Sequence, residues 1–283
     1  MPILRPMALF SLATLILAAQ PVARTATLPN GVTVHENVAY DKYPETVMDI
    51  FRPVGAGPFP AVIIIHGGGW TAGTKEAMLG NWVSRYLAKG FVVANVEYRL
   101  AVAAKAPAAV EDALTAANFF IDHAAKYAAD PNRIVVTGGS AGGHLALMVG
   151  MTPASAKLGK PVKVRAIVNF YGITDVDAQL HGAGRREYAT TWVPDGPDRT
   201  ALARRLSPMT YVRKDLPPVL TIHGDADATV PHEHGVNLTK ALKKAGAVTE
   251  MITVPQGPHG FPPATQEELY PKIFAFLKKH GVL

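Results

Sequence analysis

A serine with glycines on both sides is the first candidate for a reactive residue in this chain. Residues 138–142 read Gly-Gly-Ser-Ala-Gly and fit G-x-S-x-G, in which a sharp turn between a strand and a helix presents the serine hydroxyl. Residues 134–137 are apolar or β-branched and predict a short buried strand, and residues 144–148 have helical composition. A Cβ at position 138 or 142 would collide with neighbouring backbone, which glycine avoids. Motif and context together predict a nucleophile at Ser140.

A serine hydroxyl is a weak nucleophile until a base accepts its proton, and that base needs an orienting carboxylate. Two loops that directly follow predicted strands supply these groups in the order serine, acid, histidine. The first loop contains Asp225 and Asp227, and the second contains His259. We predict a triad of Ser140, Asp227 and His259. Asp225 is the alternative acid; Asp227 is preferred because the Gly-x-x-Asp spacing leaves room for the loop to turn towards the histidine.

A triad of this kind also requires donors for the oxyanion that develops during acyl transfer. Three successive glycines follow His66 at the end of a predicted buried strand, and glycine lets bare N–H groups approach a substrate closely. We predict the amides of Gly68, Gly69 and Ala141 as the oxyanion donors. Trp70 is assigned to substrate binding, with packing in the core as the open alternative.

The remaining histidines are predicted to be structural. His144 and His223 are expected to be hydrogen-bonded inside the fold. His232 and His234 are spaced at i and i+2 on a helix start, where their rings do not converge on a metal, and no H-E-x-x-H occurs. The absence of cysteine excludes disulfides, thiolate nucleophiles and cysteine-ligated metals. The sequence therefore predicts neither a metal site nor a cofactor.

The elements that must position these residues alternate between strand and helix. Strands are predicted at residues 31–35, 46–53, 61–65, 91–96, 134–137, 164–170, 219–223 and 249–254, and helices at 76–89, 107–127, 144–148, 233–245 and 266–280. The first two strands alternate in polarity and suggest an antiparallel edge, whereas residues 61–65 are apolar throughout, as in a strand buried on both faces. This succession predicts a single α/β domain over residues 27–283, with a mostly parallel sheet flanked by helices.

Residues 175–210 interrupt the alternation with a polar stretch that is rich in glycine and proline. Because this stretch lies between two predicted sheet strands, we expect it to fold over the carboxyl edge of the sheet as a small partial cap. Ligands bind at that edge in open α/β sheets. Side chains of the cap are therefore expected to determine substrate specificity.

Composition and the N-terminus restrict the function further. The 283 residues are 48% hydrophobic and 18% charged, as in a globular protein, and the net charge of +6 is scattered in short pairs, which argues against nucleic-acid binding. Residues 7–19 form an apolar run of signal-peptide length. We expect a signal peptide over residues 1–26, cleaved between positions 19 and 26, and a secreted or periplasmic protein without stable membrane insertion. An uncleaved membrane anchor is the alternative, and the sequence carries no signal for an oligomeric state.

Several motifs recur together, in this order, in one known family. They are H-G-G-G-W-T-A-G-T-K at 66–75, N-V-E-Y-R-L at 95–100, P-A-A-V-E-D at 107–112, D-P-N-R at 130–133, G-G-S-A-G-G-H-L-A-L at 138–147 and F-Y-G at 170–172. Over residues 35–283 the chain resembles secreted carboxylesterases of the α/β-hydrolase fold, close to hormone-sensitive-lipase-like and feruloyl-esterase-like members. The resemblance implies hydrolysis of a small-molecule or carbohydrate-linked ester, with Ser140, Asp227 and His259 at the triad positions. Pro258 departs from the family pattern and stiffens the histidine loop.

Three other functions are compatible with parts of the sequence. Gly67-x-Gly69-x-x-Ala72 after a strand, with Glu97 ending the next strand, also fits a dinucleotide-binding pattern, but that interpretation leaves Ser140 and its partners unexplained. A peptidase on the same fold commonly has a further substrate-selecting domain, for which this chain has no room beyond the cap. A catalytically inactive binding protein would have no need for a complete triad.

Residues Tyr98-Arg99 and Glu111-Asp112 are expected to form a buried polar network near the serine.

Overall fold

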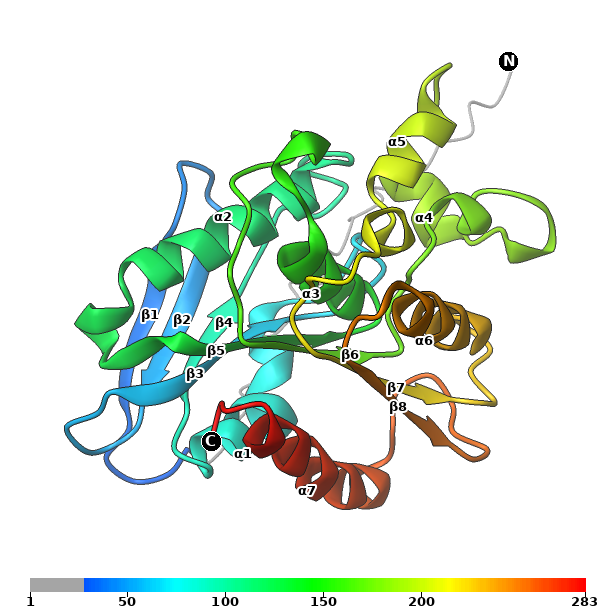
Figure 1. The fold of residues 1–283 in the computed structure, drawn as a ribbon. Helices are drawn as coiled ribbons and strands as arrows, with labels where there is room; N and C mark the ends of the chain where they lie inside the picture. The colour runs from blue at the N-terminus through cyan, green and yellow to red at the C-terminus, as the bar shows by residue number, and fades with distance from the viewer. Residues whose placement is uncertain (1–27) are drawn as a thin grey trace, which may run out of the picture.

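The computed structural model describes residues 28–283 of the chain, so the predicted signal peptide lies outside the described residues. These residues form a sheet of eight strands in the spatial order β1-β2-β4-β3-β5-β6-β7-β8 (Figure 1). The strands are β1 (Thr33–Ala39), β2 (Val47–Arg52), β3 (Phe59–Ile65), β4 (Val92–Val96), β5 (Ala129–Gly139), β6 (Ala166–Phe170), β7 (Val219–Gly224) and β8 (Thr249–Val254). The β1–β2 and β2–β4 pairs are antiparallel and the other pairs are parallel. The predicted antiparallel edge and mostly parallel sheet are confirmed.

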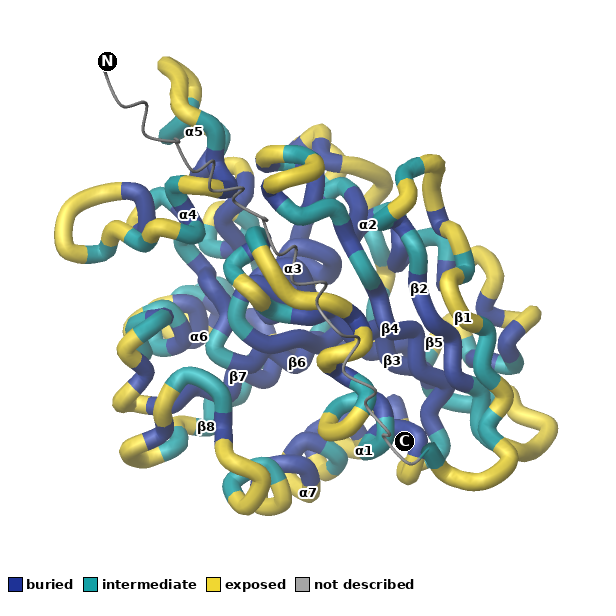
Figure 2. The backbone as a smooth tube through the Cα atoms, turned by 180° about the vertical axis from the view of Figure 1, so that it is seen from behind, coloured by how far each residue is buried: buried dark blue, intermediate teal, exposed yellow. Residues whose placement is uncertain are grey.

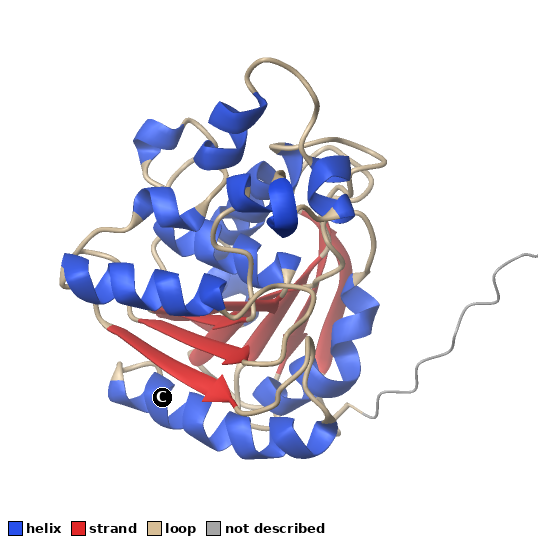
Figure 3. Cartoon of the chain, turned by 90° about the vertical axis from the view of Figure 1, so that its right-hand side faces the viewer, coloured by secondary structure: helices blue, strands red, loops and turns tan. Residues whose placement is uncertain are grey.

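Helices cover both faces of this sheet (Figures 1 and 3). One face packs against α2 (Ala108–Asp122), α3 (Ala141–Met151) and α6 (Glu233–Ala245), and the other against α1 (Ser84–Leu87) and α7 (Pro263–Lys279). Such a three-layer arrangement is what a parallel sheet needs, because its strands must be buried on both sides. Within residues 28–283, no helix has the length and apolarity needed to cross a membrane.

The central strand β3 illustrates how the sequence produces these layers. Successive side chains of a strand point to opposite faces, and the apolar run of β3 therefore supplies two cores at once. Ala61, Ile63 and Ile65 belong to the core beneath α2 and α3, whereas Val62 and Ile64 belong to the core beneath α1 and α7. All five are fully buried, and the central strands stand out as the buried part of the backbone in Figure 2.

The segment 175–210 folds into short helical pieces beyond the carboxyl ends of the strands. It contains α4 (Glu187–Trp192) and α5 (Arg199–Arg205) together with single 3₁₀ turns, and it lies beside α3 and α6 in Figure 1. Trp192 and Leu206 are fully buried and anchor the segment on the domain core. The Arg186 guanidinium also donates to the Thr229 carbonyl at 3.0 Å, which ties the cap to the loop after β7.

His144 in α3 is one of the structural histidines, as predicted. Its Nε2 donates to the Leu206 carbonyl at 2.7 Å, and its Nδ1 accepts a hydrogen bond from Trp70 Nε1 at 3.2 Å. These partners fix the neutral tautomer with the proton on Nε2. Burial lowers the pKa of His144 to about 4, although the bond to Leu206 opposes this shift.

The depressed pKa of His144 predicts an acid-sensitive fold. Above pH 6.5 the ring is neutral in the folded and in the unfolded protein. Below pH 6.5 the ring is protonated in the unfolded chain but stays neutral in the folded protein. The free energy of unfolding therefore falls as the pH drops from about 6.5 to about 4. The contribution is about 3 kcal/mol at 1.36 kcal/mol per pKa unit. His144→Gln is expected to be less stable at pH 7.5 but to lose that much less on acidification, as measured by urea unfolding. The exposed His181→Gln should follow the wild-type curve; equal acid losses in both variants would contradict this account.

Candidate active site

Ser140 lies on the turn between β5 and α3, in the conformation expected of a nucleophile elbow. Its φ of 58° and ψ of −124° are strained for a residue with a side chain. The Ser140 amide donates to the Phe170 carbonyl at 3.0 Å, and the Ser140 carbonyl accepts from the His144 amide at 2.9 Å. The turn is therefore fastened to β6 on one side and to the first turn of α3 on the other, which leaves the hydroxyl free to face the cavity described below.

The glycines of the elbow are required by contact with backbone, as the sequence predicted. A Cβ on Gly138 would lie 2.5 Å from the Ile65 carbonyl oxygen, and one on Gly142 would lie 2.1 Å from the same atom. Real Cβ atoms do not approach so closely, so any larger residue would push the elbow away from the end of β3. The elbow and the end of β3 are thereby locked together.

This contact yields a prediction with a matched control. Gly142→Ala is expected to destabilise the fold by about 3 kcal/mol or more, because the added methyl meets only backbone that cannot move aside. Gly80→Ala places its methyl where no atom lies within 4 Å and should change stability by less than about 1 kcal/mol. Urea unfolding of both variants tests the claim, and similar midpoints for the two would refute it.

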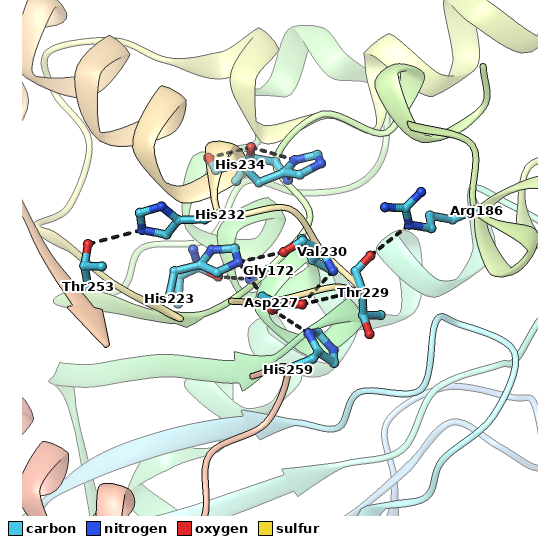
Figure 4. Close-up of polar contacts among 12 residues, drawn as sticks. Gly172, Arg186, His223, Asp227, Thr229, Val230, His232, His234, Thr253 and His259 are labelled. Carbon is cyan, nitrogen blue, oxygen red and sulfur yellow. Dashed lines mark hydrogen bonds and ion pairs between the residues drawn. The ribbon is translucent and has the colours of Figure 1, made fainter. Parts of the chain in front are cut away.

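Asp227 and His259, which the sequence predicted as the acid and the base, form a hydrogen-bonded pair. Asp227 Oδ2 accepts from His259 Nδ1 at 2.7 Å, while its Oδ1 accepts from the amides of Thr229 and Val230, both at 2.9 Å (Figure 4). Burial by itself raises the pKa of the Asp227 carboxyl, but hydrogen bonds from His223, His259 and the Val230 amide outweigh it and hold that pKa well below its usual range. A permanently charged carboxylate fixes the proton of His259 on Nδ1, which leaves Nε2 as an acceptor.

The alternative acid Asp225 forms no hydrogen bond or ion pair with the His259 ring. Its carboxylate instead accepts from the Gln256 amide at 2.6 Å and holds the chain that leaves β8. Asp225 therefore joins the two loops through backbone, whereas Asp227 reaches the imidazole directly. The structure brings together the preferred pair of the sequence analysis.

The glycine loop after β3 presents unused amides next to the elbow. Among the described residues, the N–H groups of Gly68, Gly69 and Ala141 donate to no backbone carbonyl, and Ala141 begins a helix, where free N–H groups point outward. Gly68 has φ of +115°, and a Cβ there would lie 1.9 Å from the Ala72 carbonyl oxygen. For Gly68 and Gly69 the arrangement matches what the predicted oxyanion donors require, namely amides without a backbone acceptor on a loop that favours glycine, whereas Ala141 is buried at the start of α3.

A buried polar network holds this loop from behind. His66 Nε2 lies 2.7 Å from Glu97 Oε1, and Glu97 Oε2 accepts from the Lys75 amide at 2.9 Å. The His66 ring stacks on Tyr98, whose hydroxyl donates to the His66 carbonyl at 3.2 Å. Glu97, the residue that a dinucleotide site would need for a ribose, is thus engaged by the loop itself.

The network expected among residues 98–99 and 111–112 is present as two separate parts, one formed by Arg99 with Asp112 and the other by Tyr98 with His66. Arg99 binds Asp112 through its backbone amide at 3.0 Å and through its guanidinium at distances down to 2.6 Å. Asp112 is 1% exposed. Tyr98 takes part in the support of the glycine loop instead. Both halves brace the segment between β4 and α2.

One cavity joins the serine, the histidine and the glycine loop. Its volume is about 410 Å³. The lining residues are Gly67, Gly68, Gly69, Met78, Trp82, Gly139, Ser140, Tyr171, Tyr188, Thr229, His259 and Gly260. No hydrogen bond joins the Ser140 hydroxyl to His259 within the described residues, as is common in structures without a substrate, where catalytic hydrogen bonds are long. The walls are mostly aromatic or apolar, and the polar groups gather at the elbow.

The assignment of Trp70 to substrate binding is wrong. Trp70 is fully buried, stacks on Trp192 with 4.1 Å between ring centroids, and donates through Nε1 to His144. Its φ of +59° lies in the left-handed region, which turns the side chain away from the cavity and under the cap. Trp70 therefore connects the glycine loop to the cap from inside the core.

The expectation that cap side chains form the pocket is only partly right. From the segment 175–210 the cavity receives Tyr188, whereas Met78 and Trp82 come from the segment after the glycine loop. Tyr171 follows β6, and its ring packs edge-on against His259 at 4.8 Å between centroids. The sequence analysis includes Tyr171 only as part of the F-Y-G motif at 170–172. Its place at the carboxyl end of a predicted strand could have identified it as a residue that lines the site. Met78 and Trp82 carried no such signal.

His232 and His234 diverge, as their spacing predicts. His232 contacts Thr253, and His234 accepts from the Thr174 amide at 3.2 Å (Figure 4). Across residues 28–283, no group of three or more histidine, aspartate or glutamate side chains is placed to hold a metal ion. The polar groups near Ser140 in this structure are His259, hydrogen-bonded to Asp227, and the amides of the glycine loop.

The fold and this constellation define an α/β-hydrolase. The chain belongs to the BD-FAE family, whose model matches residues 48–242. Esterase LipQ of Mycobacterium tuberculosis is 28% identical over 259 residues, which cover 84% of this chain and 58% of LipQ. The chain thus spans little more than half the length of that relative.

Solved structures extend the similarity to nearly the whole described chain. A truncated form of a carbohydrate esterase from gut microbiota superposes with a TM-score of 0.77 and 29% identity, covering 88% of this chain and 96% of that one. Thermogutta terrifontis esterase 2 phosphorylated by paraoxon gives a TM-score of 0.72 and 26% identity, covering 90% of this chain and 96% of that one. Both of these structures are esterases, and the similarity covers nearly all of each chain.

Proposed function

We propose that this protein is a serine carboxylesterase that uses Ser140, His259 and Asp227 as its triad. The observation that carries the proposal is that the elbow serine, an aspartate-oriented histidine and the glycine loop line one cavity, and that the Gly68 and Gly69 amides of this loop donate to no backbone carbonyl of the described residues. Ser140 Oγ attacks the ester carbonyl while His259 Nε2 accepts its proton. The amides of Gly68, Gly69 and Ala141 stabilise the oxyanion, an effect of roughly 3–4 kcal/mol per donor.

The remaining steps of the reaction use the same groups. Protonated His259 donates its proton to the departing alcohol, and the acyl group remains on Ser140. Water then attacks the acyl carbon while His259 accepts its proton. As the tetrahedral intermediate collapses, His259 returns that proton to Ser140 Oγ and the carboxylic acid is released. Asp227 stays charged throughout and stabilises the imidazolium, in keeping with its strongly depressed pKa. None of these steps needs a metal or cofactor.

The relatives support this assignment. LipQ is named an esterase, and a structural neighbour is a carbohydrate esterase. The phosphorylation of Thermogutta terrifontis esterase 2 by paraoxon is a reaction of an activated nucleophile in that protein. We propose a small-molecule or carbohydrate-linked ester as the substrate here, with feruloyl or acetyl esters of plant polysaccharides as the first candidates, and a secreted or periplasmic location.

Labelling by a serine-directed fluorophosphonate tests the proposal. The mature protein is expected to gain one adduct, located at Ser140 by peptide mass spectrometry, and to lose activity in parallel. A catalytically inactive binding protein would stay folded and unlabelled, which would refute the proposal. A panel of p-nitrophenyl esters of rising acyl length, feruloyl and acetylated-sugar esters, and peptide substrates then separates an esterase from a peptidase.

A further inference from the structure

His223 is a second histidine beside the carboxylate of Asp227. It is the last but one residue of β7 and is fully buried. Its Nε2 lies 2.9 Å from the Val230 carbonyl oxygen and 3.4 Å from Asp227 Oδ2 (Figure 4). The carboxylate oxygen that faces His259 therefore also faces His223.

The partners of the ring determine where its proton lies. The Val230 carbonyl can only accept, so Nε2 of His223 must carry the proton. That N–H points to Val230 and is shared, over the longer distance, with Asp227. Within the described residues Nδ1 has no hydrogen-bond partner, and it faces Gly235, where a Cβ would lie 2.9 Å from it. Gly235 thus leaves space for the ring to sit against α6.

Burying Nδ1 of His223 without a hydrogen-bond partner costs free energy of folding. If the residue served only to fill space, an apolar side chain could do so without this cost. The compensating interactions are all on Nε2. They hold both ends of the turn that carries Asp227, since His223 lies before it and Val230 lies after it. The same turn supplies the two amides that bind Asp227 Oδ1.

We propose that His223 is a positioning residue for the triad. Its Nε2–H fixes the turn 225–230 and, with the two backbone amides, sets the plane of the Asp227 carboxylate so that Oδ2 meets His259. The role rests on the proposed function. The negative charge of Asp227 stabilises His259 most when His259 becomes an imidazolium. Loss of the His223 Nε2–H donor therefore lowers kcat and leaves KM nearly unchanged.

A matched pair of amide substitutions tests the donor. The amide nitrogen of His223→Gln can reach the place of Nε2, whereas that of His223→Asn reaches only the place of Nδ1. We expect the Asn variant to lose about 10- to 100-fold in kcat at constant KM, and the Gln variant to stay within about threefold of wild type. Thermal unfolding of both reports the structural effect separately. Equal losses in the two variants, or a lower melting temperature with wild-type kcat, would overturn the proposal.

Nitrogen NMR of the histidine rings in the wild-type protein provides a measurement that does not depend on turnover. We expect the His223 ring as a neutral Nε2–H tautomer, assigned by its loss in His223→Gln. An Nδ1–H tautomer would overturn the positioning role, whereas a wild-type protein that hydrolyses no ester would overturn the proposed function. The two failures are therefore distinguishable.

Discussion

Ser140→Ala is expected to lower kcat for a p-nitrophenyl ester by about 10⁵- to 10⁶-fold, the loss found when the nucleophile of a serine hydrolase is removed. The remaining amide donors and the cavity still bind the ester, so KM should change little. The variant should fold normally, because alanine has the same Cβ and meets the same backbone strain at φ 58°. The measurement is steady-state hydrolysis by the freshly purified variant, compared with wild-type enzyme whose active sites are titrated with a fluorophosphonate.

Ser140→Gly provides the companion variant for this prediction. Glycine tolerates positive φ without a steric cost, so relief of the elbow strain should stabilise the fold by about 1 kcal/mol while activity is lost to the same extent. Such an exchange of stability for activity is typical of residues held in strained conformations at functional sites. Turnover within tenfold of wild type in either variant would exclude Ser140 as the nucleophile.

The parts of the fold that depend on local sequence were predictable. The run over 249–254 and the amphipathic stretch over 233–245 coincide with β8 and α6, because each has its own period and ends at a turn or glycine. The elbow was predictable because its G-x-S-x-G pattern stands between a short apolar run and a helical stretch, although the backbone that its glycines approach, at Ile65, lies far away in the sequence. The order of the triad followed from strands whose carboxyl ends share one edge of the sheet.

Side-chain directions that depend on distant segments were not predictable. Trp70 follows the glycine loop, and its neighbours in sequence do not reveal a left-handed φ or a partner such as Trp192, which lies 122 positions later. Met78 and Trp82 reach the cavity because the helical turns after the glycine loop pack beside the elbow. His223 could be called structural from its strand, but its approach to Asp227 depends on how the following turn closes.

The choice between two aspartates separated by one residue is the sharpest test of the site. Both follow β7, yet Asp227 binds the His259 ring at 2.7 Å and Asp225 binds the Gln256 amide at 2.6 Å. An amide side chain can replace the second interaction, because its oxygen still accepts a hydrogen bond. It cannot replace the first, because the transition state needs a negative charge beside the imidazolium.

Asp227→Asn is therefore expected to lower kcat by about 10⁴-fold, as the same exchange does in other serine hydrolases, where the histidine adopts the wrong tautomer. Asp225→Asn should stay within about tenfold of wild type. Both variants are measured with one p-nitrophenyl ester at pH 7.5, alongside their urea unfolding curves. A severe loss in the Asp225 variant combined with a mild loss in the Asp227 variant would reverse the assignment of the acid. Because the two exchanges add the same amide to the same turn, a difference of about a thousandfold between them can only reflect which carboxylate faces the histidine.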